Sequence, residues 1–208
     1  MTTIVVTGSD TGIGKTVFAS ALVGALGASY WKPVQAGLTP PTDSQIVAQL
    51  SGAPADRIVP EAYRLKEPVA PHIAARYMKI ALDPARLDLP AVDGPLVVEG
   101  AGGVLVPITP QFLFADLVAR WGAPVVLVAR TALGTINHSL LSIEALRARG
   151  VPILGIAFIG MPNQDGEAAI ADIGGVKRLG RLPPIDPLDA ESLVDAFSAN
   201  FRVEDFRP

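Results

Sequence analysis

The 208-residue chain contains no cysteine and only two histidines, His72 and His138. Without cysteine it can form neither a disulfide nor a thiolate metal site, and it has no cysteine nucleophile. Two histidines also exclude a histidine-rich metal centre. We expect His138 to be structural and His72 to orient a loop, so neither is assigned proton transfer.

The chain also has few charges. Charged residues make up 18% of the sequence and the net charge is −3, whereas about 25% charged residues is usual for soluble domains. The sequence has no run of basic residues and no basic–aromatic pattern that could follow a phosphate backbone. We therefore expect no nucleic-acid partner.

Long hydrophobic runs are missing, although hydrophobic residues account for 50% of the chain. A membrane-spanning helix needs roughly 18 consecutive apolar residues, and the richest run, 153–161, has nine, two of them glycine. The N-terminal segment lacks the basic flank of a signal peptide. We expect a cytoplasmic protein with no membrane partner, whose apolar excess serves a buried sheet or an oligomer interface.

Short apolar runs alternate with longer helical stretches along the sequence. The expected strands are 3–7, a segment ending near 34, 95–99, 124–129 and 151–159. The expected helices are 15–26, 112–121, 135–149 and 188–201. This alternation predicts an α/β fold of three layers, in which a mostly parallel sheet has helices on both faces. We expect one domain over 1–208, with 38–95 forming helices and loops over the carboxyl ends of the strands, where such folds bind ligands.

The strongest motif is the run GSDTGIGKT at 8–16, which follows the first expected strand and opens the first expected helix. In this context successive backbone N–H groups form an anion cradle, as in the phosphate loop of P-loop NTPases. Lys15 would then oppose the β- and γ-phosphates, and the Thr16 hydroxyl would bind Mg²⁺. Five residues separate Gly8 from Gly14, where the standard motif has four. The alternative, a glycine-rich turn that only starts a helix, does not explain the Lys-Thr pair.

Two carboxylates are candidate Mg²⁺ ligands. Glu99 ends an apolar strand and precedes Gly100-Ala101-Gly102-Gly103. A carboxylate at such a position is costly unless it is paired or binds a metal; a helix cap or a salt bridge is the alternative. Asp43 lies in Thr42-Asp43-Ser44, and by itself this segment favours a helix cap.

Two further segments are candidate anion sites. Lys32 ends the second expected strand between Trp31 and Pro33. Most lysines lie on solvated surfaces, but this one is expected to point into the site and hold an anion. Residues 134–137 open a helix directly after the strand at 124–129, so this helix start could bind a substrate carboxylate. An ordinary threonine-capped helix explains the same residues equally well.

Taken together, these motifs resemble the dethiobiotin synthetase family. The phosphate loop, with its additional residue, is similar to that of the family. So are Lys32-Pro33-Val34, Glu67-Pro68 with Pro71-His72, the run at 99–103 with Pro107, Phe114-Ala115-Asp116, and the run at 133–138. The blocks occur in family order from residue 3 to about 155, and the final 50 residues match more loosely.

The resemblance implies an ATP-dependent ligase of biotin synthesis. The substrate would be 7,8-diaminononanoate, which takes up CO₂ as a carbamate on one amine. The carbamate would be phosphorylated by ATP to a carbamic–phosphoric anhydride, and the second amine would close the ring, giving dethiobiotin, ADP and phosphate. Such catalysis needs positioning and charge stabilisation rather than a protein nucleophile. The family works as a homodimer with its sites at the interface.

The resemblance also assigns roles to residues of this chain. The Mg²⁺ ligands would be Thr16, Asp43 and Glu99. The catalytic residues would be the phosphate lysine Lys15, the carbamate lysine Lys32 and, near the substrate, Thr11. The nucleotide would contact Gly12, Ile13, Gly14, Lys15, Thr16, Val17 and Gly160. The substrate would contact Thr11, Lys32, Gly102, Gly103, Val104 and, from the partner subunit's helix start, Gly134, Thr135, Ile136 and Asn137.

Two positions depart from the family pattern. Ala36 replaces a serine or threonine that is frequent in the family, which removes one hydrogen bond to phosphate or carbamate. Gly160 stands where many members have an asparagine that reads adenine. Because hydrogen-bonding sites discriminate better than shape alone, we hypothesise weak base selection, with CTP, GTP or UTP able to replace ATP.

A ParA/MinD-like positioning ATPase is the alternative from another functional class. Such proteins carry an additional lysine early in the phosphate loop, where this chain has Ser9-Asp10-Thr11. They also need a membrane helix or a basic DNA-binding face, and neither is visible in the sequence. The ligase domain of a cobyrinate amide synthetase would carry a fused glutaminase with a catalytic cysteine, which this chain lacks.

Overall fold

A computed structural model describes residues 2–207. Its centre is a seven-stranded sheet in the order β11-β10-β9-β1-β6-β2-β4, and every pair of neighbours is parallel. The strands are β1 (Thr3–Gly8), β2 (Ser29–Trp31), β4 (Ile58–Val59), β6 (Leu96–Gly103), β9 (Val125–Arg130), β10 (Ile153–Ile159) and β11 (Arg178–Leu182). The predicted α/β fold with a parallel sheet is thus confirmed.

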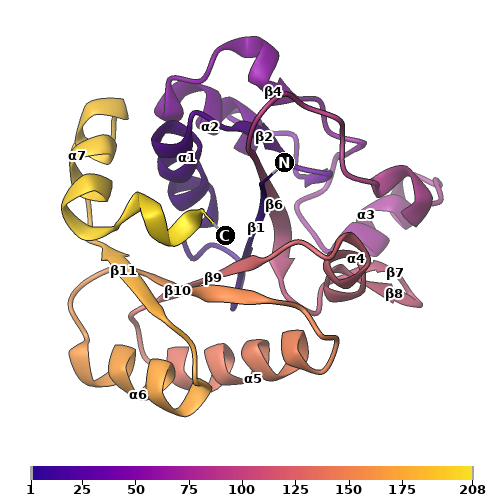
Figure 1. The fold of residues 1–208 in the computed structure, drawn as a ribbon. Coiled ribbons are helices and arrows are strands. Elements are labelled where there is room, and N and C mark those ends of the chain that lie inside the picture. Colours follow the sequence, from indigo (N-terminus) through magenta and orange to yellow (C-terminus); the bar gives the residue numbers. More distant parts are fainter. Residues whose placement is uncertain (1, 208) are drawn as a thin grey trace.

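Helices cover both faces of this sheet, and each face has its own hydrophobic core (Figure 1). Val5 of β1 belongs to one core, whereas its neighbours Ile4 and Val6 belong to the other. This alternation follows from the two-residue period of a strand. The first core is completed by α3 (Pro71–Tyr77), α4 (Phe114–Trp121), α5 (Thr135–Arg147) and α6 (Gln164–Gly174). The second is completed by α1 (Lys15–Leu26), α2 (Asp43–Ser51) and α7 (Ala190–Asn200).

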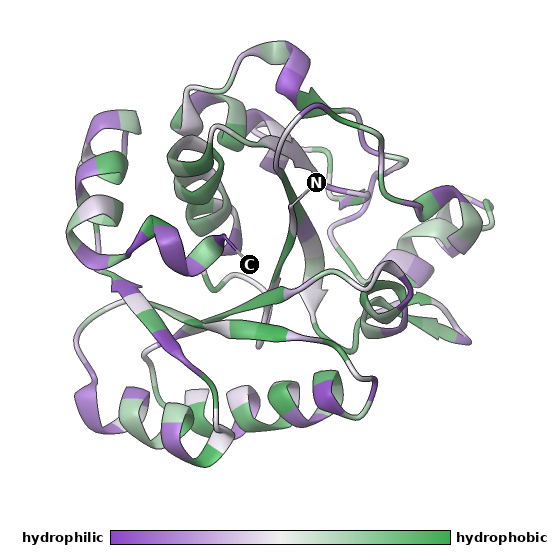
Figure 2. Cartoon of the chain, viewed as in Figure 1, coloured by the Kyte–Doolittle hydropathy of each residue, from purple (hydrophilic) through white to green (hydrophobic). Residues whose placement is uncertain are grey.

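The hydropathy of the chain matches these layers (Figure 2). The central strands are largely hydrophobic, and hydrophilic residues are more frequent in the helices and loops around them. Strand β9 has five successive buried residues, as expected for a strand covered on both faces. Within residues 2–207, no helix combines the length and the apolar character that crossing a membrane requires.

The C-terminal segment is anchored to α1 by a cluster of four phenylalanines. Phe18 of α1 meets Phe201 edge-to-face at a ring separation of 5.5 Å, and Phe197 stacks on Phe201 at 4.8 Å. Phe206, in the 3-10 helix η3 (Val203–Phe206), completes the cluster and is fully buried. The last part of the chain therefore supports the helix that begins at the phosphate loop.

The segment 38–95, which was expected to form helices and loops, also contains short strands. It includes α2, α3, β5 (Tyr63–Leu65) and the 3-10 helices η1 (Ala55–Arg57) and η2 (Pro84–Leu87), besides edge strand β4. Strand β5 pairs with β3 (Val34–Ala36) in a separate two-stranded sheet, and β7 (Pro107–Thr109) pairs with β8 (Phe112–Leu113) in a hairpin.

Several boundaries differ from those predicted. The helix at 15–26 is confirmed, but the second strand ends at Trp31 rather than near residue 34. Pro33 cannot donate to a ladder, and the chain resumes as β3 in the smaller sheet. The helix expected from 112 begins at Phe114, because 112–113 form β8. Helix α6 and strand β11 were not predicted: β11 is an edge strand that begins with Arg178 and lacks an apolar run.

Candidate nucleotide and metal site

The phosphate loop connects β1 to α1 and leaves the start of α1 open. Gly14 precedes the helix with a left-handed φ of 93°, and a Cβ there would lie 2.8 Å from Ile159 Cδ1. Among the described residues, no side chain caps this helix, and its first turn contains no acidic residue. The free N–H groups and the helix dipole therefore favour an anion at this end.

Lys15 is buried beneath this loop, with only 6% of the residue exposed. Its Nζ donates to the backbone oxygen of Asp10 at 2.7 Å, which fixes the side chain across the loop. Burial disfavours the charged form and lowers the pKa of Lys15 to about 8, although the Glu99 carboxylate opposes this effect. An anionic phosphate beside Lys15 would favour the ammonium form.

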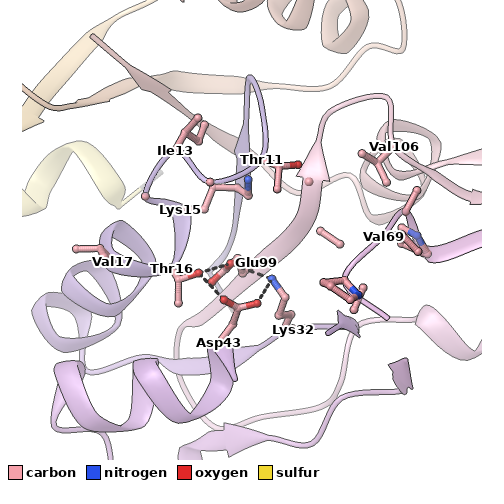
Figure 3. A pocket seen from close by; sticks show the side chains of 18 residues that line it. Thr11, Ile13, Lys15, Thr16, Val17, Lys32, Asp43, Val69, Glu99 and Val106 are labelled. Carbon is pink, nitrogen blue, oxygen red and sulfur yellow. Dashed lines mark hydrogen bonds and ion pairs between the residues drawn. The ribbon is translucent and has the colours of Figure 1, made fainter. Parts of the chain in front are cut away.

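The three predicted metal ligands converge from α1, α2 and β6 (Figure 3). The Thr16 hydroxyl lies 2.9 Å from Asp43 Oδ1 and 2.9 Å from Glu99 Oε1. Hard oxygen ligands of this kind suit Mg²⁺, which usually combines one or two carboxylates with phosphate oxygens. Within residues 2–207, no group of three or more His, Cys, Asp or Glu side chains is arranged to hold a metal. One hydroxyl and two carboxylates fit Mg²⁺ that is also bound by the phosphates of a nucleotide.

Asp43 faces the site because the neighbouring residue takes over the capping position. Thr42 is the N-cap of α2, and its N–H donates to the Gln45 side chain at 2.8 Å. Burial alone would raise the pKa of Asp43, but the Lys32 ammonium outweighs it and lowers the pKa. Asp43 is therefore held as a carboxylate at the start of the helix.

Lys32 points into the site rather than into solvent, and only 4% of the residue is exposed. Its Nζ lies 2.9 Å from Glu99 Oε1, 3.0 Å from Asp43 Oδ2 and 3.4 Å from the Gly100 carbonyl oxygen. Burial works against its charge, but the two carboxylates prevail and raise the pKa of Lys32. The salt bridge considered as an alternative for Glu99 is thus present, with Lys32 as its cation.

Sequence reasoning missed Tyr30, which holds the other oxygen of Glu99. The Tyr30 hydroxyl donates to Glu99 Oε2 at 2.8 Å, and the residue is fully buried. Burial, and then the Glu99 carboxylate, raise the pKa of Tyr30 well above its usual value. A tyrosine in a buried strand generally needs a hydrogen-bond partner for its hydroxyl. From that requirement, a hydrogen bond between Tyr30 and Glu99 could have been predicted.

Lys15, Thr16, Lys32, Asp43 and Glu99 line a cavity of about 390 Å³ (Figure 3). Its wall includes the expected Thr11, Gly102 and all residues from Gly12 to Val17. It also includes residues that were not assigned a role: Ala101, Val106 and the loop of Pro68, Val69, Ala70 and Pro71. Ala36, where a hydrogen bond to phosphate or carbamate was expected to be missing, contributes only a methyl group to this wall.

Gly103 and Val104 line an adjacent cavity of about 380 Å³, which shares Thr11 and Val106 with the first. This second cavity is also bordered by Asp10 and His138, whose Oδ2 and Nδ1 atoms lie 3.9 Å apart. The ring nitrogen Nδ1 of His72 is buried without a hydrogen-bond partner among the described residues.

Five predicted contacts are not brought together with the rest. Gly134, Thr135, Ile136 and Asn137 open α5 but, in the described part of the chain, line neither of these two cavities. Gly160 follows β10 and also lies outside both cavities. A Cβ at residue 160 would lie 2.5 Å from Thr131 Oγ1, so a side chain there would require Thr131 to move.

Comparisons with known proteins agree with the motifs. A family model described as an AAA domain matches residues 2–192. The ATP-dependent dethiobiotin synthetase BioD of Rhizorhabdus wittichii is 62% identical over 205 residues, which cover 99% of this chain and 98% of that protein. The protein of the same name from Agrobacterium fabrum is 59% identical over 202 residues, covering 97% and 95%. The chain belongs to the dethiobiotin synthetase family. The match of this synthetase family extends through the C-terminal segment, beyond the blocks that ended near residue 155.

Solved structures of low identity share the fold. The MinC:MinD cell division protein complex of Aquifex aeolicus superposes with a TM-score of 0.54 at 14% identity, covering 96% of this chain and 95% of that chain. A ParA family ATPase from Chlorobium tepidum gives 0.55 at 10% identity, covering 93% and 96%. At this identity the likeness concerns fold alone, so it does not favour a positioning ATPase over a dethiobiotin synthetase.

Proposed function

We propose that the chain catalyses the ATP-dependent carboxylation and ring closure of 7,8-diaminononanoate, giving dethiobiotin, ADP and phosphate. One observation carries the proposal. A phosphate loop, two carboxylates and two buried lysines share a single cavity, in a chain 62% identical to a dethiobiotin synthetase over nearly its full length.

The reaction divides into three balanced steps. One substrate amine attacks CO₂, forms an N–C bond and loses a proton, giving a carbamate. A carbamate oxygen then attacks the γ-phosphorus of ATP, so that an O–P bond forms and the P–O bond to ADP breaks. Finally the second amine attacks the carbamate carbon, the C–O bond to phosphate breaks, and the new ring nitrogen loses a proton.

The chain would contribute mainly fixed charges and dipoles. The open start of α1 and Lys15 would hold the phosphates, and Lys32 with Thr11 would orient the carbamate oxygens toward the γ-phosphorus. Thr16, Asp43 and Glu99 would hold Mg²⁺, which neutralises charge on the transferred phosphate. The backbone of Gly102, Gly103 and Val104 would line the path of the substrate.

We also propose that the enzyme is a cytoplasmic homodimer. Leu105, Ile136 and Leu141 are large apolar residues with 39–56% of their surface exposed, and they lie on α5 or beside the second cavity. Covering such residues favours association. The α5 start, which is not used by either cavity of its own chain, would then bind the substrate carboxylate in the partner's site.

Base selection is a separate question that turns on Gly160. A residue without a side chain cannot offer a side-chain hydrogen bond to the base edge, so we expect CTP, GTP and UTP to support turnover. Comparing kcat/KM for the four nucleoside triphosphates tests this expectation. An ATP preference above roughly a hundredfold, about 2.7 kcal/mol, would refute it.

The variant Lys32→Ala tests the proposed function against the positioning-ATPase alternative. The proposed synthetase function predicts that this variant loses ring closure while retaining nucleotide binding, because Lys32 acts on the carbamate and not on the phosphate loop. Unchanged dethiobiotin formation would remove Lys32 from the mechanism. Rapid ATP hydrolysis by the wild type in the absence of diaminononanoate would favour the positioning ATPase.

A further inference from the structure

Lys32 uses all of its hydrogen-bonding capacity on the protein itself. An ammonium group has three N–H donors and no acceptor. In this structure three acceptors surround the Lys32 Nζ: Glu99 Oε1 at 2.9 Å, Asp43 Oδ2 at 3.0 Å and the Gly100 oxygen at 3.4 Å. In this state the group has no donor left for a substrate anion.

The same two carboxylates are the proposed metal ligands. Glu99 Oε1 and Asp43 each contact both the Lys32 ammonium and the Thr16 hydroxyl. A divalent cation held by these oxygens would come within a few ångströms of the ammonium, where two positive charges repel strongly. The lysine and the metal therefore compete for one set of oxygens.

The carboxylates are the fixed part of this cluster, and the lysine is the part able to move. Glu99 is fully buried, with Oε2 held by the Tyr30 hydroxyl at 2.8 Å, and Asp43 is fixed at the start of α2. Lys32 has a flexible stem of four methylene groups, and it lines the same cavity as Thr11 and Ala101. A small rotation of the stem would carry its ammonium along the cavity wall.

We propose that Lys32 alternates between two partners. Without a divalent cation it bridges Asp43 and Glu99; when the cation takes those oxygens, Lys32 is released toward the anionic group of the substrate. The inference rests on the proposed metal site. It makes metal binding and carbamate binding mutually reinforcing, because each favours the position of Lys32 that the other requires.

The variant Lys32→Met tests the exchange through metal affinity rather than activity. Binding of Mn²⁺, a paramagnetic substitute for Mg²⁺, can be measured by electron paramagnetic resonance of the free ion in the presence of ADP. Removing the competing ammonium is expected to tighten Mn²⁺ binding by about tenfold or more, a size typical of changes beside a metal ligand. Equal or weaker binding in the variant would overturn the proposal.

Lys177→Met is the matched control. Lys177 pairs with Asp205 at 2.7 Å and precedes β11 at the amino end of that strand, away from the site. The variant Lys177→Met also removes one positive charge, but far from the site, so its Mn²⁺ affinity is expected to equal that of the wild type. If Lys177→Met tightened Mn²⁺ binding as much as Lys32→Met, net charge alone would explain the change, and the proposed exchange would be contradicted.

Two further measurements keep the outcomes distinct. Glu99→Gln is expected to abolish Mn²⁺ binding, and retained binding would refute the proposed metal site itself. If Glu99→Gln loses Mn²⁺ binding but Lys32→Met binds Mn²⁺ as the wild type does, only the proposed exchange of Lys32 between partners is refuted. Lys32→Met leaves the buried Glu99 and the part-buried Asp43 without their cation, so it is expected to lower the melting temperature. Lys32→Gln removes the charge but keeps a polar group. Both variants should gain more thermal stability from Mn²⁺ than the wild type does, and a smaller gain in both would count against the proposal.

Discussion

At the scale of single residues, each of the three proposed metal ligands, Thr16, Asp43 and Glu99, contacts more than one neighbouring side chain. Glu99 accepts from Tyr30 on one oxygen and meets Lys32 and Thr16 with the other. Partners of metal ligands tune metal affinity by orienting the ligand. Tyr30 is thus the residue that we expect to position Glu99.

The variant Tyr30→Phe should weaken Mg²⁺ affinity in the presence of ADP by roughly tenfold, the lower end of such effects. It should also reduce the free energy of unfolding by about 1–3 kcal/mol, since one buried carboxylate oxygen loses its donor. Isothermal titration and urea denaturation measure the two effects. Tyr77→Phe is the control, because Tyr77 is 60% exposed; unaltered metal affinity in Tyr30→Phe would show that the hydroxyl does not position Glu99.

At the scale of elements, the site depends on how helices begin. Helix α1 begins after Gly14, α2 begins at Asp43 behind its cap Thr42, and α4 begins at Phe114. The first two starts carry the residues proposed to bind phosphate and metal, and the third supports the first hydrophobic core beside β6. Substitutions at the starts of α1 and α2 should therefore affect mainly ligand binding, whereas those at the start of α4 should affect mainly the stability of the fold.

Gly14→Ala should reduce nucleotide affinity by at least tenfold, because a Cβ would strain a left-handed backbone and meet Ile159 at 2.8 Å. Gly52→Ala is the matched control: Gly52 also has a positive φ of 66°, and a Cβ added there would meet no atom within 4 Å. The control should lose about 1 kcal/mol of stability but bind nucleotide normally. Equal affinities in a fluorescent-nucleotide titration would contradict this account of the loop.

Asp116 ties the start of α4 to Arg149, which follows the end of α5 at Arg147, and gives a pH-dependent prediction. It accepts from Arg149 at 2.7 Å and from the Leu113 N–H at 2.8 Å, and Arg149 above all lowers the pKa of Asp116. A folded-state pKa below the usual 3.8 means that the contribution to stability is complete above pH 3.8 and is lost as pH falls through the lowered value.

Asp116→Asn should therefore lower the free energy of unfolding by about 1 kcal/mol at pH 7. This is the size expected for weakening a partly exposed ion pair and one hydrogen bond at a helix start. The difference from the wild type should shrink as pH falls below 3.8. Urea denaturation at a series of pH values measures it. A difference that stays constant down to the acid transition would exclude the carboxylate as its source.

At the scale of the whole molecule, much of the fold followed from local patterns. Continuous apolar runs marked β1, β6, β9 and β10, because parallel strands are buried on both faces. Helix α6 and strand β11 gave no such signal, since edge strands need less apolar sequence and α6 is rich in polar residues at its start.

The site was predictable where a motif spans adjacent residues, and less so where tertiary packing decides. The phosphate loop at 8–16 and its lysine could be predicted because all of their residues are contiguous in the sequence. Asp43 alone resembled a cap, and only the position of α2 against α1 and β6 brings it within 2.9 Å of Thr16. Tyr30 carried no motif, since its role depends on the register that places β2 beside β6.

Assembly also belongs to this scale. Leu141→Glu places a charge on an α5 residue that is 56% exposed and borders the second cavity, so we expect it to shift the protein from dimer to monomer and to lower kcat/KM at least tenfold. Ile173→Glu is the control on α6, where Ile173 is 70% exposed. Sedimentation velocity distinguishes them; a wild type that sediments as a monomer would refute the proposed dimer.

The most direct test of the central claim follows the carbon atom. The protein is incubated with 7,8-diaminononanoate, ¹³C-bicarbonate, Mg²⁺ and ATP, and the products are measured by mass spectrometry and ADP release. We predict dethiobiotin that carries one ¹³C atom, formed in equal amount to ADP. ADP release without labelled dethiobiotin would contradict the assignment of this site to ring closure.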